Sequence, residues 1–162
     1  MKTFILVLFT FTSFNILAQS KGVKVLVELS PAGSFEISSK KIKGKVKKSG
    51  SGFISENIST SVNDFTTGLE LRDHHTKQKL ESNIYPRITV SNAKGQDGKG
   101  QAIIEVRSMK VPISFTYKEL TAKYIQVNFN LNLKDFQFSG LSYMGVGVKD
   151  TVQVVAILPL GK

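Results

Sequence analysis

The sequence contains no cysteine and no tryptophan, and its 162 residues include only two histidines. Without cysteine the chain forms no disulfide and no thiolate metal site, and a bacterial lipoprotein anchor is excluded. Reactive motifs are missing as well: neither G-x-S-x-G nor H-E-x-x-H occurs, and the glycines between positions 95 and 100 belong to no P-loop. The twelve carboxylates are scattered along the chain. These absences argue against an enzyme and favour a binding or structural protein.

The first residues predict export. Lys2 supplies a positive charge, positions 4–14 are mostly apolar, and Ala18 is a small residue suited to the last position before a signal-peptidase cut. The apolar run is short for a bilayer span, which favours a cleaved signal over a membrane helix. We therefore expect a signal peptide at 1–18 and one mature domain at 19–162, large enough to form a core.

Apolar residues recur at every second position after residue 22. Segments 23–29, 102–107, 111–118 and 151–158 show this alternation, and the longest case is YIQVNFNLNLK at 124–134. A period of two is typical of antiparallel strands with one buried face. The pattern predicts eight or nine short strands, hence an all-β barrel or sandwich, and a barrel of about eight strands can hold one small ligand.

The most basic stretch is KKIKGKVKK at 40–48, with six lysines in nine positions. Read as one strand, it places Ile42, Gly44 and Val46 on one face, while Lys41, Lys43, Lys45 and Lys47 lie on the other. We interpret the lysines as a solvated strand face. Because the net charge of the whole chain is +10, an anionic membrane surface is a second possible partner. Export argues against nucleic acid.

Two segments break the alternation. Residues 66–86 are rich in charge, and we expect a short helix near 70–82 that ends before Tyr85 and Pro86. Residues 91–101, SNAKGQDGKGQ, contain three glycines and predict a flexible hairpin connection.

The segment RDHH at 72–75 is the densest group of polar side chains. Adjacent histidines on a helix point about 100° apart, so His74 and His75 do not easily share one metal. A structural role, a metal site that combines one histidine with Asp73, and contact with the polar head of a ligand all remain open.

Phenylalanine and tyrosine side chains are spread over the expected strands. They either fill a solid core or line a tunnel for an elongated lipid, and periodicity does not separate these alternatives because both follow the same pattern.

Three segments resemble the YceI-like family of exported lipid-binding proteins: VNDFTTGLELRDHH, KLESNIYPRITVS and GVGVKDTVQVVAILPL. The matching features are the Thr67-Gly68 pair, the Arg72-Asp73-x-His75 segment, Tyr85-Pro86 before a strand, and Asp150 before the last strand. The resemblance implies an eight-stranded antiparallel lipocalin-like β-barrel in the periplasm. It further implies binding of a long isoprenoid or fatty-acyl molecule, with no catalytic residue, cofactor or essential metal.

The leading hypothesis is therefore non-enzymatic sequestration or transport of a long-chain amphiphile. The rivals are a filled barrel whose lysine face docks on anionic surfaces and a metal-dependent enzyme that uses His74 or His75. The expected partners are the lipid, an anionic membrane surface and a second copy of the chain, but no nucleic acid. The polar rim is expected at Arg72, Asp73, His75 and Tyr85. Parity assigns the tunnel wall to Phe35, Ile37, Ile58, Val62, Phe65, Ile88, Val90, Ile104, Val106, Ile113, Phe115, Tyr117, Val127, Phe129, Leu131, Val152 and Val154.

Overall fold

The computed structural model describes residues 20–161. The predicted signal segment, 1–18, lies outside the described residues. Strands dominate, with one α-helix, α1 (Glu70–Lys79), and two 3-10 turns, η1 (Val62–Asp64) and η2 (Leu133–Phe136). The strands are β1 (Gly22–Ser30), β2 (Ser34–Ser39), β3 (Ile42–Lys43), β4 (Lys47–Ser49), β5 (Gly52–Ser61), β6 (Arg87–Gln96), β7 (Lys99–Val106), β8 (Met109–Thr121), β9 (Tyr124–Asn132), β10 (Ser142–Tyr143), β11 (Val146–Val148) and β12 (Thr151–Pro159).

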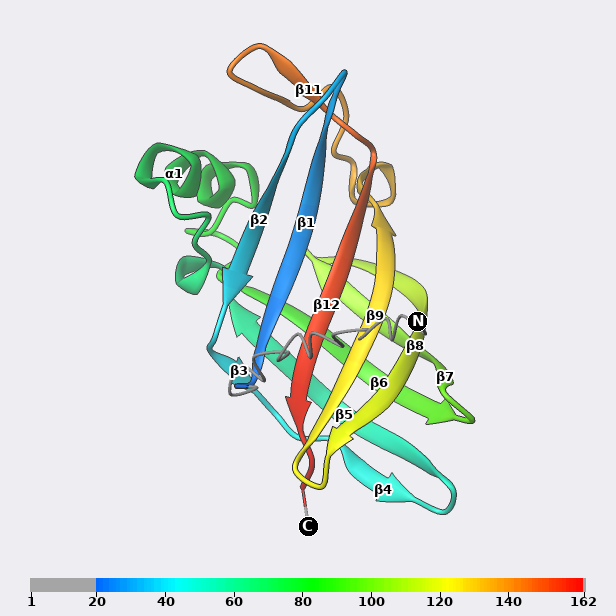
Figure 1. The fold of residues 1–162 in the computed structure, drawn as a ribbon. Coiled ribbons are helices and arrows are strands. Elements are labelled where there is room, and N and C mark those ends of the chain that lie inside the picture. The colour runs from blue at the N-terminus through cyan, green and yellow to red at the C-terminus, as the bar shows by residue number, and fades with distance from the viewer. Residues whose placement is uncertain (1–19, 162) are drawn as a thin grey trace, which may run out of the picture.

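The strands form one strongly curled antiparallel sheet. Its order is β10-β11-β1-β12-β9-β8-β7-β6-β5-β3, while β2 pairs with β1 and β4 with β5. Only Lys40 and Lys41 separate β2 from β3, so the chain passes directly from pairing with β1 to pairing with β5. This passage links the two ends of the sheet, and in Figure 1 β1, β2, β12 and β9 lie across from β5, β6 and β7. Eight of the described strands have six residues or more, which confirms the predicted lipocalin-like fold.

The alternation of apolar and polar residues along the strands places the core on the inner face of the curled sheet. On β7, Ala102, Ile104 and Val106 are buried, and on β9 Ile125 keeps only 2% of its surface exposed. The polar residues between them face outward, because successive side chains of a strand point to opposite sides of the sheet. The predicted faces of these strands are therefore confirmed.

The lysine-rich stretch differs from the prediction of one continuous strand. Ile42 and Val46 are buried and the lysines are exposed, as expected, but the strand stops after Lys43 and resumes at Lys47. Gly44 causes the break: its φ is +101°, and a Cβ there would collide with the carbonyl oxygen of Asn57 on β5.

The hairpin predicted at 91–101 is present, but it is tight, and the flexible connection expected across this segment is not found. The segment is mostly strand, and β6 and β7 are joined by Asp97 and Gly98 alone. Both residues have positive φ, 52° and 78°, as a two-residue Asp-Gly hairpin turn requires. The predicted helix near 70–82 is present as α1, followed by a turn from Leu80.

No helix among residues 20–161 combines the length and the apolar character that a membrane crossing requires.

Candidate ligand cavity

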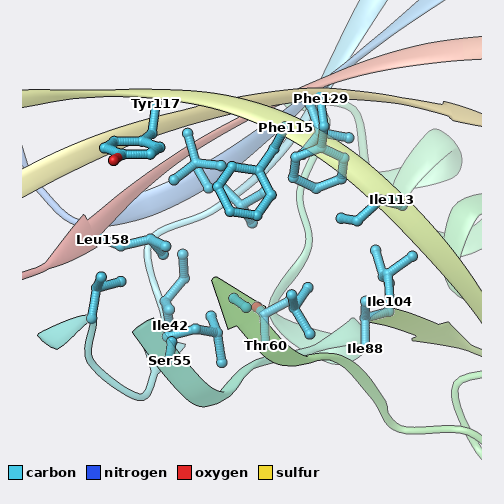
Figure 2. Close-up of a pocket in the computed structure, with 18 of the residues that line it drawn as sticks. Ile42, Ser55, Thr60, Ile88, Ile104, Ile113, Phe115, Tyr117, Phe129 and Leu158 are labelled. Atoms are coloured by element: carbon cyan, nitrogen blue, oxygen red, sulfur yellow. The ribbon is translucent and has the colours of Figure 1, made fainter. Parts of the chain in front are cut away.

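The barrel contains a cavity of about 140 Å³, here called the inner cavity. Figure 2 shows the rings of Phe115, Tyr117 and Phe129, from β8 and β9, on one side of it. Ile42 on β3 and Ile104 on β7 face these rings from the opposite side. Because each strand contributes the apolar half of its alternating pattern, the wall is almost entirely hydrocarbon.

Besides the phenol of Tyr117, three aliphatic hydroxyl groups belong to this wall, those of Ser55, Ser59 and Thr60. The Ser55 hydroxyl donates a hydrogen bond to the carbonyl oxygen of Lys45 at 3.0 Å. The Thr60 hydroxyl donates to the carbonyl oxygen of Lys41, also at 3.0 Å. Since the Ser55 and Thr60 donors are already used by the protein and the rest of the wall is almost entirely hydrocarbon, the inner cavity suits a hydrocarbon better than a polar group.

A second cavity, here called the outer cavity, has a volume of about 430 Å³. Side chains of β1, β2, α1, η2 and the β10–β11 hairpin contribute to its wall. Figure 1 shows these elements at the same end of the barrel. Five residues line both cavities: Val25, Phe65, Ile88, Val106 and Leu131. The two cavities are therefore separated only by side chains.

The outer cavity has a basic edge on an otherwise apolar wall. Arg72, His75 and Lys79 of α1 contribute to the wall, whereas no aspartate or glutamate does. The guanidinium carbon of Arg72 lies 4.5 Å from the ring centroid of Phe35 and 4.7 Å from that of Tyr143. A cationic plane close to an aromatic ring is held by the negative face of the ring. These contacts fix Arg72 at the cavity.

Asp73, which was predicted to lie on the polar rim, instead holds α1 in place through hydrogen bonds. Its carboxylate accepts hydrogen bonds at 2.6 Å from both the backbone N–H and the hydroxyl of Thr67, and at 3.0 Å from the hydroxyl of Thr66. Burial acts to raise the pKa of this carboxyl, but the hydrogen bonds from Thr67 and Thr66, with a smaller contribution from Lys77, lower the pKa below its ordinary value. Asp73 therefore fastens α1 to the segment before it and does not line either cavity.

With one exception, the residues predicted as tunnel wall do line a cavity, and their part in ligand binding stays a prediction. Val62 lines neither cavity, because β5 ends at Ser61 and the 3-10 turn η1 interrupts the alternation. Of the predicted rim, Arg72 and His75 line the outer cavity and Tyr85 does not. The inner wall includes Ile58, Phe65, Ile88, Val90, Ile104, Val106, Ile113, Phe115, Tyr117, Val127, Phe129, Leu131 and Val154, and the outer wall includes Phe35, Ile37, Phe65, Ile88, Val106, Leu131 and Val152.

Further wall residues were missed by the prediction. Ile125 and Leu158 share a strand face with predicted wall residues, so the same signal was available for them. Val23 and Val25 belong to an alternating segment on which no wall residue was predicted. The residues around η2 and the β10–β11 hairpin carry no such signal, because these elements are too short for a period.

The histidines do not build a metal site with their neighbours. The rings of His74 and His75 are 6.2 Å apart at an angle of 53°. Among residues 20–161, no three histidine, aspartate or glutamate side chains are grouped so as to hold a metal ion. The carboxylate considered as a partner, Asp73, is engaged by Thr66 and Thr67.

The fold is similar to solved structures of polyisoprenoid-binding and YceI proteins. A polyisoprenoid-binding domain from Saccharophagus degradans matches with a TM-score of 0.61 and 16% identity, over 85% of this chain and 91% of that one. The YceI protein of Campylobacter jejuni matches with a TM-score of 0.55 and 16% identity over 100% of both chains. No protein-family profile and no curated protein matches the sequence. These likenesses establish a shared fold and confirm, at that level, the predicted resemblance to YceI-like proteins.

Proposed function

We propose that this protein is a non-enzymatic binding protein that sequesters or transports a long-chain amphiphile of the isoprenoid or fatty-acyl class. The observation that carries the proposal is the pair of adjacent cavities with a shared apolar wall. The name of the Saccharophagus degradans domain with the same fold supports a polyisoprenoid as one such ligand.

The sizes of the cavities support a particular placement of the chain. The outer cavity, at about 430 Å³, falls within the range of about 300–1,000 Å³ that is typical of small-molecule sites. The inner cavity, at about 140 Å³, is close to the roughly 150 Å³ apolar cavity that holds one benzene ring. The outer cavity therefore takes most of a chain, and the inner cavity takes its last five or six carbons, about one isoprene unit.

Apolar contact alone supplies sufficient affinity. Each buried methylene contributes about 0.8 kcal/mol, so a buried chain of twelve carbons gains up to about 10 kcal/mol before the losses of ordering. Micromolar binding needs a net gain of about 8 kcal/mol, and association costs at least about 4 kcal/mol, so a chain of about fifteen carbons or more reaches it. Such a ligand is bound without any reactive side chain.

Identification of a co-purifying lipid tests this function. We expect native mass spectrometry of the purified protein to reveal a mass excess, and organic extraction to release an isoprenoid or fatty-acyl molecule. A protein that carries no lipid, and that takes up none when mixed with a total lipid extract, would exclude the proposal.

The proposal includes export to the periplasm after cleavage near Ala18. Its support is the charged and then apolar character of residues 1–18. N-terminal sequencing of the protein from a periplasmic extract should give a first residue close to position 19, whereas a chain that retains Met1 in the cytoplasm would contradict export.

A second candidate function, docking on anionic membrane surfaces, is favoured by the row of lysines that runs from the residue before β3 to the start of β4. Lys41, Lys43, Lys45 and Lys47 are all exposed, and of these only Lys41 forms an ion pair with a described residue, Asp64 at 2.7 Å. Replacement of all four by glutamine distinguishes the functions. Loss of binding to phosphatidylglycerol vesicles with unchanged lipid uptake would favour docking as a separate activity.

A further inference from the structure

Arg72 carries a buried donor that the protein does not use. The Nε atom of Arg72 is the one buried side-chain nitrogen or oxygen in the described part of the chain that has no hydrogen-bond partner. None of the seven ion pairs between described residues includes Arg72. A guanidinium stays charged under all ordinary conditions, so it cannot relieve its burial by losing a proton. An unpaired buried donor on a charged group is costly and needs an explanation.

Arg107 provides an internal comparison. Its guanidinium carbon lies 4.4 Å from the ring centroid of Phe138, much as Arg72 lies against Phe35 and Tyr143. Arg107, however, pairs with the Glu81 carboxylate at 3.1 Å and donates to the carbonyl oxygen of Lys79 at 3.4 Å. Arg107 does not line the outer cavity. Arg107, which stacks on a ring but does not line the outer cavity, thus has a carboxylate partner, whereas Arg72, which lines the outer cavity, has none among the described residues.

The charged side chains around the outer cavity have one sign. Arg72 and Lys79 line it together with His75, and no carboxylate does. The nearest carboxylate in the sequence, Asp73, is held by Thr66 and Thr67. A negatively charged group in this cavity would therefore meet donors and no acidic side chain.

We infer that the ligand carries an anionic head, a carboxylate or a phosphate, that accepts a hydrogen bond from Arg72 while its chain occupies the apolar part of the two cavities. This inference rests on the proposed lipid-binding function. It narrows the ligand from any long apolar molecule to fatty acids and lipid phosphates.

Competition between three ligands of equal chain length tests the inference. Dodecanoate, dodecyl phosphate and dodecanol are titrated against the neutral probe N-phenyl-1-naphthylamine bound to the purified protein. We expect the better of the two anions to bind at least about tenfold more tightly than dodecanol, the factor that one charge-assisted hydrogen bond supplies. The order of the two anions distinguishes a carboxylate head from a phosphate head.

Variants assign the preference to Arg72. In R72Q the ratio of anion affinity to alcohol affinity should fall to near one, whereas in the matched control R107Q it should stay at the wild-type value. R72K, which keeps a charge but lacks the Nε donor, should lower the ratio as well and serves if R72Q does not fold.

Equal affinity of wild-type protein for all three compounds, or a ratio that survives in R72Q and R72K, would overturn the inference but leave the lipid-binding function intact. Failure of all three compounds to displace the probe would overturn both.

Discussion

Arg72 and Asp73 are neighbours on α1 with opposite surroundings. Successive side chains on a helix point about 100° apart, so Asp73 turns to the hydroxyls of Thr66 and Thr67 while Arg72 lies against the rings at the outer cavity. One residue fixes the helix, and the other lies at the outer cavity. The sequence places both on one polar segment, but it does not reveal this division, because the threonine contacts depend on how the chain turns before the helix.

Removal of the Asp73 carboxylate should loosen this attachment. We expect D73N to lower the free energy of unfolding by about 1–2 kcal/mol at pH 7, the size of one or two hydrogen bonds to a charged acceptor. Because the pKa of Asp73 is lowered in the folded protein, its contribution is present above the unfolded pKa of about 3.9 and is lost as the pH falls through the folded value. Urea unfolding of both proteins at pH 7 and near pH 2.5 measures this, and the difference should shrink at low pH.

The exposed Asp135 provides the control, since it makes none of these contacts. D135N should leave the free energy of unfolding within about 0.5 kcal/mol of wild type. An equal loss in both variants would show that the threonine contacts are not responsible.

At the scale of elements, the β6–β7 hairpin leaves room for the aromatic side chains of β8. A Cβ at Gly95 would lie 2.6 Å from Cε1 of Tyr117, and one at Gly100 would collide with the ring of Phe115. Glycine within a strand often marks such a close approach. Both rings line the inner cavity, so these glycines help to set its shape.

Substitution of Gly95 by alanine should push the Tyr117 ring aside. We expect G95A to lower the free energy of unfolding by about 1–3 kcal/mol, as overpacking does, and to weaken binding of N-phenyl-1-naphthylamine because the ring moves within the inner cavity. Chemical denaturation and probe titration measure the two effects. G147A is the control, since its Cβ would meet its nearest neighbour at 3.8 Å, and both measurements should stay close to wild type.

The strand faces could be predicted because a half-buried strand has a period of two. This period places Ile104 and Ile125 on the inner face, and both are buried. The break at Gly44 could not be predicted, because the sequence does not show that the backbone there passes close to the carbonyl oxygen of Asn57 on β5. The tight Asp97-Gly98 turn was available in the sequence as a hairpin signal, but the surrounding glycines suggested a longer loop.

At the scale of the whole molecule, the barrel strands and the elements at the end of the barrel contribute different parts of the cavity wall. The strands build an apolar wall, and α1 adds the basic edge of the outer cavity. Figure 1 shows α1 and the β10–β11 hairpin at one end of the barrel. Alternation predicts which residues face inward. It does not predict how much space remains between them, because that depends on side-chain volumes across the barrel and on short elements without a period.

A larger side chain between the cavities should separate them. Val25 on β1 lines both cavities, and Leu26 beside it is 36% exposed. In V25F the ring blocks the way into the inner cavity, so we expect affinity to stop rising at a shorter chain length than in the wild type. L26F, on the opposite face of the strand, should leave this chain length unchanged. Titration with a series of alcohols measures this, and equal behaviour of the two variants would contradict a continuous binding site.

The most direct measurement of the central claim is the affinity of the wild-type protein for linear alcohols of six to sixteen carbons. If the chain lies in the two cavities, affinity should rise by up to about fourfold with each methylene and level off once both cavities are filled. Affinity that does not depend on chain length, or no binding at any length, would contradict the account.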